Sequence, residues 1–187
     1  MKEKIKLYPI AEQNEIIEKD FEVIENLELY VENLLTNNAK IITAQKDCKI
    51  EARWAQVGEV VDTRPRVSVD GKTYTFSETK REVSEDKANN VVVKNPDGEE
   101  YLLTREKFLE RYVQDNYGNW ISKGEPQQFI KINEDIIITP TNWGGDKQVV
   151  CAGSVINVTN KQDLYAITNL AFEKTYKTKE REAEQER

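Results

Sequence analysis

Residues 101–112 read YLLTREKFLERY, and residues 165–176 read YAITNLAFEKTY. The two stretches belong to a longer gapless alignment of residues 91–112 with residues 155–176. Such a repeat is typical of a duplicated structural unit, so the chain is predicted to contain two copies of one small fold. The shared positions are Tyr101, Thr104, Phe108 and Tyr112 in the first copy and Tyr165, Thr168, Phe172 and Tyr176 in the second.

Each copy predicts a short helix that begins after its threonine. A threonine hydroxyl can accept a hydrogen bond from the free amides of a first helical turn, which makes Thr104 and Thr168 candidate N-caps. The phenylalanine and the second tyrosine lie four residues apart and therefore on one helix face. We expect these rings in the hydrophobic core; a cage of rings around a ligand is the alternative.

Short stretches with β-strand character precede each predicted helix. Asp70-Gly71 stands between two alternating stretches, which is a strong signal for a tight hairpin. Asn95 to Gly98 predicts a second turn between strands at 91–94 and 100–103. The second copy is predicted to open with strands at 129–132 and 135–139.

Residues 11–36 predict one long acidic amphipathic helix. Ile17, Phe21, Ile24, Val31 and Leu35 recur at helical spacing, and no glycine or proline interrupts them. A break near Asn26 into a helical hairpin is the alternative. With two β-rich repeats that each close with a short helix, the predicted fold class is α+β.

Five segments follow from this pattern. Residues 1–46 form an acidic helical segment, 47–113 the first repeat, 114–127 a connector, 128–178 the second repeat and 179–187 a charged tail. A chain of 187 residues has room for this arrangement.

Composition excludes several classes of function. The chain has no histidine, which removes the commonest general base and zinc ligand. Its two cysteines make no disulfide framework. No apolar run reaches the length of a membrane helix, and the start of the chain has no signal core, so we expect a cytoplasmic protein of a bacterial host. The net charge of −7 equals that of residues 11–32, which argues against direct nucleic-acid binding.

The second copy resembles a small module of phage and prophage proteins that is named for a Pro-Gly-Asp-Tyr-Gly signature. Ala152 to Ile156 occupy the signature position, where Gly153 is retained, and the repeated tyrosines and Phe172 have the module's spacing. The first copy is similar to a diverged version. The resemblance implies a β-rich module from a phage or mobile element and no particular activity.

These observations predict a non-enzymatic accessory protein that binds a protein or a ligand and uses no cofactor or metal. The partner is a protein with a basic surface or a second copy of the chain, with Ile17, Phe21 and Ile24 at the contact. The alternative is an acidic anti-defence inhibitor that imitates nucleic-acid phosphates against a host enzyme. Solvated surface or core is the competing interpretation of each candidate binding residue: Glu15, Glu18, Glu22, Glu25, Arg53, Trp54, Arg64, Arg66, Trp120 and Trp143.

Overall fold

The computed structural model describes residues 1–178 apart from 12, 48, 78–80, 83–89, 96–97 and 143, and it leaves the side chains of Arg81 and Glu82 undescribed. Strands hold 45% of the residues and helices 15%, so the protein is mostly β and the predicted α+β class is wrong. The strands form two five-stranded sheets, one six-stranded sheet and a two-stranded pair of β5 (Val60–Val61) with β8 (Arg81–Glu82).

The predicted long N-terminal helix is wrong. Its first part is the strand β2 (Ile17–Val23), which pairs antiparallel with β1 (Lys2–Pro9). The segment alternates Ile17, Lys19, Phe21 and Val23 with acidic residues, and Phe21 is fully buried. Ile17 and Phe21 fit both a helical and a two-residue period, and pairing with β1 selects the strand.

The second part of that segment is the helix α1 (Leu27–Thr36). Asn26 is its N-cap, and its side-chain oxygen accepts a hydrogen bond from the Leu29 amide at 3.1 Å. The helix buries Leu27 and Val31 against the isoleucines of the second repeat. The break near Asn26 is therefore real, but it joins a strand to a helix rather than two helices.

The twin motif is confirmed. In the first copy the elements are β9 (Asn90–Lys94), β10 (Glu100–Thr104), α2 (Arg105–Arg111) and β11 (Tyr112–Gln114). In the second copy they are β16 (Val155–Asn157), β17 (Tyr165–Ile167), α3 (Asn169–Thr175) and β18 (Tyr176–Thr178). Thr104 caps α2 through the Lys107 amide, and Thr168 caps α3 through the Ala171 amide.

The repeated phenylalanines are core residues in both copies. Phe108 is 3% exposed and Phe172 is 5% exposed. The centre of the Phe108 ring lies 5.3 Å from that of Tyr112, and the Phe172 ring lies 5.5 Å from that of Tyr176. Like surroundings at equivalent positions are what a duplicated unit requires.

The two five-stranded sheets are built alike and exchange strands. Their strand orders are β10-β9-β4-β12-β11 and β17-β16-β13-β3-β18. The chain passes directly from β3 (Ile41–Lys46) in the second sheet to β4 (Lys49–Trp54) in the first, and from β12 (Trp120–Ser122) in the first to β13 (Gln127–Lys131) in the second. We call the first sheet with α2 the first half and the second sheet with α3 the second half.

The two crossing segments pair with each other along their length. Thr43 of β3 lies opposite Gln128 of β13, and Ile50 of β4 lies opposite Trp120 of β12. Two antiparallel stretches therefore run through both sheets and join the halves. The domain boundaries at 47–113 and 128–178 stay a prediction, because each sheet takes one strand from outside the matching range.

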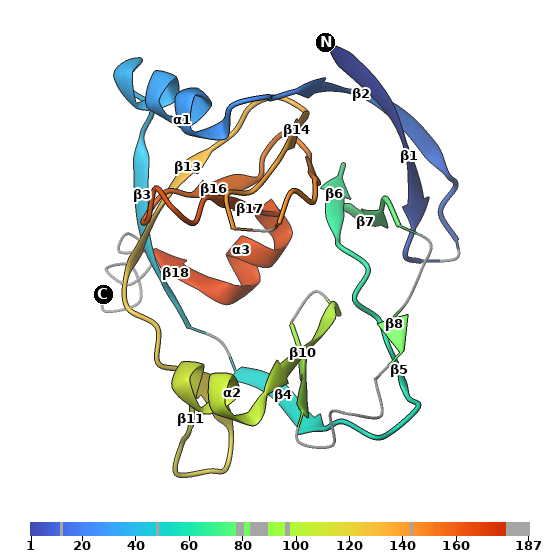
Figure 1. Cartoon of the computed structure of the whole chain (residues 1–187), viewed down its shortest axis with the longest axis vertical. Helices are drawn as coiled ribbons and strands as arrows, with labels where there is room; N and C mark the ends of the chain where they lie inside the picture. The colour runs from blue at the N-terminus through green and yellow to red at the C-terminus, as the bar shows by residue number, and fades with distance from the viewer. Residues whose placement is uncertain are drawn as a thin grey trace.

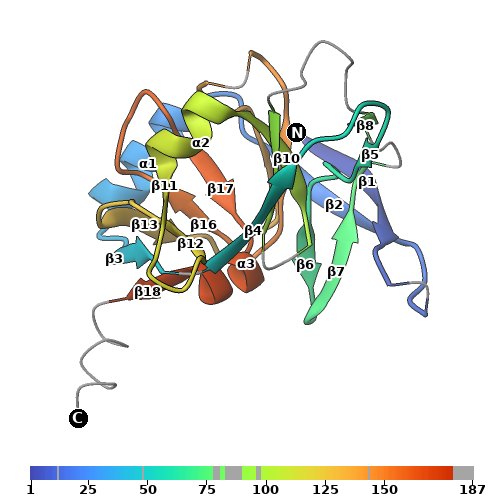
Figure 2. The ribbon, with the colours of Figure 1, turned by 90° about the horizontal axis from the view of Figure 1, so that it is seen from below.

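The six-stranded sheet joins the insertions of the two copies. Its order is β15-β14-β2-β1-β7-β6, with β6 (Val67–Val69), β7 (Lys72–Thr75), β14 (Ile136–Ile138) and β15 (Gln148–Val150). The hairpin predicted at Asp70-Gly71 is confirmed, since both residues have positive φ angles and connect β6 to β7. The β1–β2 hairpin lies between the two insertions, on the side away from α3 in Figure 1 and Figure 2.

No helix in the described part of the chain is long and apolar enough to cross a bilayer.

Candidate ligand cavity between the halves

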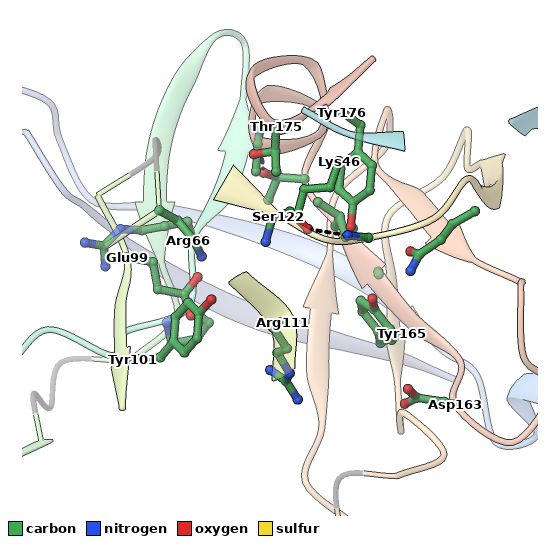
Figure 3. Close-up of a pocket in the computed structure, with 18 of the residues that line it drawn as sticks. Lys46, Arg66, Glu99, Tyr101, Arg111, Ser122, Asp163, Tyr165, Thr175 and Tyr176 are labelled. Carbon is green, nitrogen blue, oxygen red and sulfur yellow. Dashed lines mark hydrogen bonds between the residues drawn. The ribbon is translucent and has the colours of Figure 1, made fainter. Parts of the chain in front are cut away.

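A cavity of about 890 Å³ lies between the two halves. All four repeated tyrosines line it: Tyr101 and Tyr112 from the first half, and Tyr165 and Tyr176 from the second. Figure 3 shows Tyr101 and Tyr165 on opposite sides of the space. The phenylalanine of each copy therefore fills its own core. Tyr112 and Tyr176 belong to the same cores and also line the cavity, whereas Tyr101 and Tyr165 are only half-buried.

Lys46 connects the two halves at this cavity. Its backbone lies opposite Tyr176 in the second sheet. Its ammonium instead donates a hydrogen bond to the Tyr112 hydroxyl of the first half, at 3.1 Å, and lies 5.3 Å from the centre of that ring. The Tyr112 hydroxyl is also 2.8 Å from the Tyr101 hydroxyl. A half-buried chain of one ammonium and two phenols thus lies in the cavity wall.

Hydrogen bonds from two side-chain amides hold the cavity wall of the second half in place. Asn157 donates from its side chain to Gln127 at 2.7 Å and to the Tyr165 hydroxyl at 3.1 Å. Gln148 both donates to and accepts from the backbone of Ala166. Burial raises the pKa of Tyr165, which is therefore a neutral phenol near neutral pH.

The cavity lining carries charges of both signs. The cations are Lys46, Arg66, Arg111 and Lys123. The carboxylates are Glu99, Glu110, Glu125 and Asp163. In Figure 3, Glu99 lies beside Tyr101 and Asp163 beside Tyr165, and Lys46 lies near Ser122 and Thr175.

Arg66 is a structural part of this wall. Its guanidinium donates to Asp62, to the Arg64 carbonyl at 2.7 Å and to the Gly98 carbonyl at 3.3 Å. Arg64 donates to both Asp62 oxygens at 2.8 Å. Hydrogen bonds from Arg64 and then Arg66 hold the pKa of Asp62 well below its usual range. The two predicted arginines are thus brought together, and both are engaged by a carboxylate.

The four predicted acidic residues do not share a helix face. Glu18 and Glu22 point to one side of β2, Glu15 precedes that strand, and Glu25 lies in the turn before α1. The neighbouring strand β1 places Lys6 opposite Glu18 and Lys2 opposite Glu22. Cross-strand neighbours of opposite charge reduce the acidity of this surface.

Arg53 and Trp54 lie on β4, outside the cavity lining. Arg53 is paired with Glu59 and Glu100, and its pKa is raised, chiefly by the hydrogen bond to Glu59. The Trp54 side chain is 54% exposed, and the Arg105 guanidinium lies 5.6 Å from its ring centre.

Of the two other candidate tryptophans, only Trp120 lies within the described residues. Trp120 packs edge-on against Phe108, with 4.7 Å between ring centres, which agrees with the core interpretation. Trp143 lies outside the described residues.

Sequence reasoning missed Lys46. Nothing around it in the sequence distinguishes it from other lysines, and only the strand exchange places it beside Tyr112. The tyrosines could be found, because they are the repeated positions.

Among the described residues, no group of three or more cysteine and carboxylate side chains is arranged to hold a metal ion. No family model matches the chain, and no curated protein and no solved structure was found to match it.

Proposed function

We propose that the protein is a non-enzymatic binding protein that holds a small polar ligand in the cavity between its halves. The observation that carries the proposal is the position of the four repeated tyrosines, which line one shared cavity. Phenols offer both an aromatic face and a hydrogen-bonding group, and aromatic side chains beside placed polar groups are typical of ligand sites.

The strand exchange supports the proposal as well. Lys46 and Tyr176 come from the second half, Tyr101 and Tyr112 from the first, and the ribbon of crossing strands fixes both halves relative to each other. A site on paired strands keeps its geometry better than a site on loops.

Within this proposal the chain acts as an accessory protein of a phage or mobile element, which is supported by the sequence resemblance of residues 152–176. A protein partner stays a prediction. The acidic-inhibitor alternative has no long helix to rest on, and lysines lie opposite the acids of β2.

Ligand titrations followed by NMR test the proposal. The probes are phenol, benzylamine and phenyl phosphate, which share one ring and differ in charge. We expect at least one probe to shift the amide signals of residues around the cavity. If none of the three shifts those signals, the cavity is not a ligand site.

A cavity-filling variant gives the matched control. Ala171 lines the cavity from α3, whereas Lys174 lies exposed on the same helix outside the lining. Ala171→Trp should weaken binding of the active probe about tenfold or more, and Lys174→Trp should leave it unchanged. Equal binding by both variants would place the probe elsewhere on the protein.

A further inference from the structure

Resting on the proposed function, we propose that Lys46 makes the cavity selective for ligands that carry an oxyanion, such as a phosphate or carboxylate group. The ligand's charged group contacts the Lys46 ammonium beside Tyr112, and the rest of the ligand lies among the tyrosines.

Two equivalent positions in the halves carry different side chains. Lys46 lies opposite Tyr176 in the second sheet, and Ser122 lies opposite Tyr112 in the first. The two halves therefore place a lysine and a serine at the same point of the fold. The lysine side chain crosses to the other half, where its ammonium donates to the Tyr112 hydroxyl.

Lys46 lacks the carboxylate partner that other half-buried cations of the described residues have. Lys19 has Asp135 at 2.9 Å and Arg64 has Asp62 at 2.8 Å, as half-buried cations usually require. Among the carboxylates that the structure describes, none forms an ion pair with Lys46. Its ammonium has three N–H donors, and the Tyr112 hydroxyl takes one of them.

The Ser122 hydroxyl beside this ammonium can donate a further hydrogen bond. The Ser122 oxygen accepts from the Gly124 amide at 3.0 Å, which leaves the Ser122 hydroxyl proton to donate. Figure 3 shows Lys46 and Ser122 next to each other, with Arg111 across the space between Tyr101 and Tyr165. An oxyanion needs several donors of this kind around it, and an ammonium donor gives the stronger, charge-assisted bonds.

The positive charge of Lys46 also decides between anionic and cationic ligands. Of the four carboxylates in the lining, Asp163 lies beside Tyr165 in Figure 3, whereas Glu99 lies beside Tyr101, whose hydroxyl is joined to the Lys46 ammonium through the Tyr112 hydroxyl. An oxyanion at Lys46 meets an opposite charge there, whereas an amine at the same point meets a like charge.

Binding constants for phenyl phosphate, benzoate, phenol and benzylamine test the inference on the full-length protein. Phenyl phosphate or benzoate should bind about tenfold or more tightly than phenol, because a charge-assisted hydrogen bond is worth about that factor. The two anionic probes distinguish a phosphate from a carboxylate. Lys46→Met should remove this preference, so that the anionic probes bind the variant no more tightly than phenol does.

Two further variants serve as controls. Lys46→Arg should retain the preference for anions, because it keeps the charge. Lys177→Met removes a lysine on the adjacent β18, outside the cavity lining, and should leave every probe unaffected.

The outcomes separate the two proposals. Binding of phenol or benzylamine in the cavity without a gain for the anionic probes overturns the oxyanion inference and leaves the proposed function standing. An anion preference that survives in a folded Lys46→Met variant also overturns the inference. Failure of all four probes to reach the cavity overturns the proposed function itself.

Discussion

At the residue scale, several polar side chains of this protein are held by specific partners. Asp62 accepts from two arginines, Asp135 accepts from Lys19 and from the Ala152 amide, and Tyr30 donates to Glu134 at 2.7 Å. The Lys19–Asp135 pair ties β2 to the insertion of the second copy, and the Tyr30–Glu134 bond ties α1 to the same region. Lys46 differs from these, since its described partner is the Tyr112 hydroxyl rather than a carboxylate.

The Asp62 cluster predicts a pH-dependent contribution to stability. Asp62→Asn should lower the free energy of unfolding at pH 7 by about 1–3 kcal/mol, since it leaves Arg66 buried with a weaker partner. The pKa of Asp62 is lowered on folding, so its carboxylate stabilises the fold above its ordinary pKa. That contribution is lost as the pH falls through the lowered value.

Urea unfolding of both proteins at several pH values from 7 down to about 3 measures this difference. The gap between the native protein and the variant should narrow toward the acid end. A gap that stays constant or widens there would show that Asp62 is not held as a carboxylate.

The buried Cys151 thiol predicts low reactivity. Burial, and next the charge of Asp135, raise the pKa of Cys151 to about 12. Very little thiolate exists at pH 8, and the thiolate is the reactive form. In a Cys48→Ser background, iodoacetamide should modify Cys151 much more slowly than it modifies the unfolded chain, as followed by intact mass. Modification at the unfolded rate would mean that Cys151 is accessible.

At the element scale, the two halves fill equivalent cores with different strands. Ala52 of β4 and Phe129 of β13 occupy the same position, opposite Val93 and Asn157 of the paired strands. Likewise Ala44 of β3 corresponds to Trp120 of β12. The second half therefore places a large ring on its β13 position, and the first half places it on β12, next to an alanine in both cases.

This exchange of large and small residues predicts the result of moving the ring. Trp120→Ala should cost about 3–5 kcal/mol, because it opens a cavity beside Phe108. Adding Ala52→Phe should recover part of that loss, since the double variant copies the arrangement of Ala44 and Phe129 in the second half.

Urea denaturation of the single and double variants measures the recovery, with Ala52→Phe alone as the control. Alone it should destabilise, because Trp120 already fills the space. A double variant that is no more stable than Trp120→Ala would contradict the equivalence of the two cores.

The sequence predicted some of these elements and missed others for physical reasons. The twin helices were predictable because a threonine N-cap followed by two rings four residues apart is typical of a short helix with one buried face. The Asp70-Gly71 hairpin was predictable because its turn needs positive φ angles. The strand at Ile17 was predicted as a helix, since Ile17 and Phe21 fit both periods and the choice depends on pairing with β1.

The exchange of β3 and β12 between the halves could not be predicted, because strand partners are set by register rather than by local pattern. Lys46 was missed for the same reason, and with it the character of the cavity.

At the scale of the whole molecule, the halves depend on each other. Each sheet contains a strand whose chain continues into the other sheet, and the β1–β2 hairpin joins the insertions of both copies into one further sheet. Neither half can lose its strands without disturbing the other. The duplication thus produced one folded body and a cavity between its parts.

This dependence predicts a single cooperative unfolding transition. In calorimetry, the measured enthalpy of unfolding should equal the van't Hoff enthalpy within error. Two resolved transitions, or a measured enthalpy well above the van't Hoff value, would show that the halves unfold separately and that the exchanged strands do not couple them.

A crystal structure of the protein with phenyl phosphate shows directly whether the cavity holds an oxyanion at Lys46. We expect phosphate density between the halves, with an oxygen at hydrogen-bond distance from the Lys46 Nζ atom and the ring among the repeated tyrosines. Phenyl phosphate bound only on the outer surface, or a cavity filled by side chains from one half alone, would contradict this expectation.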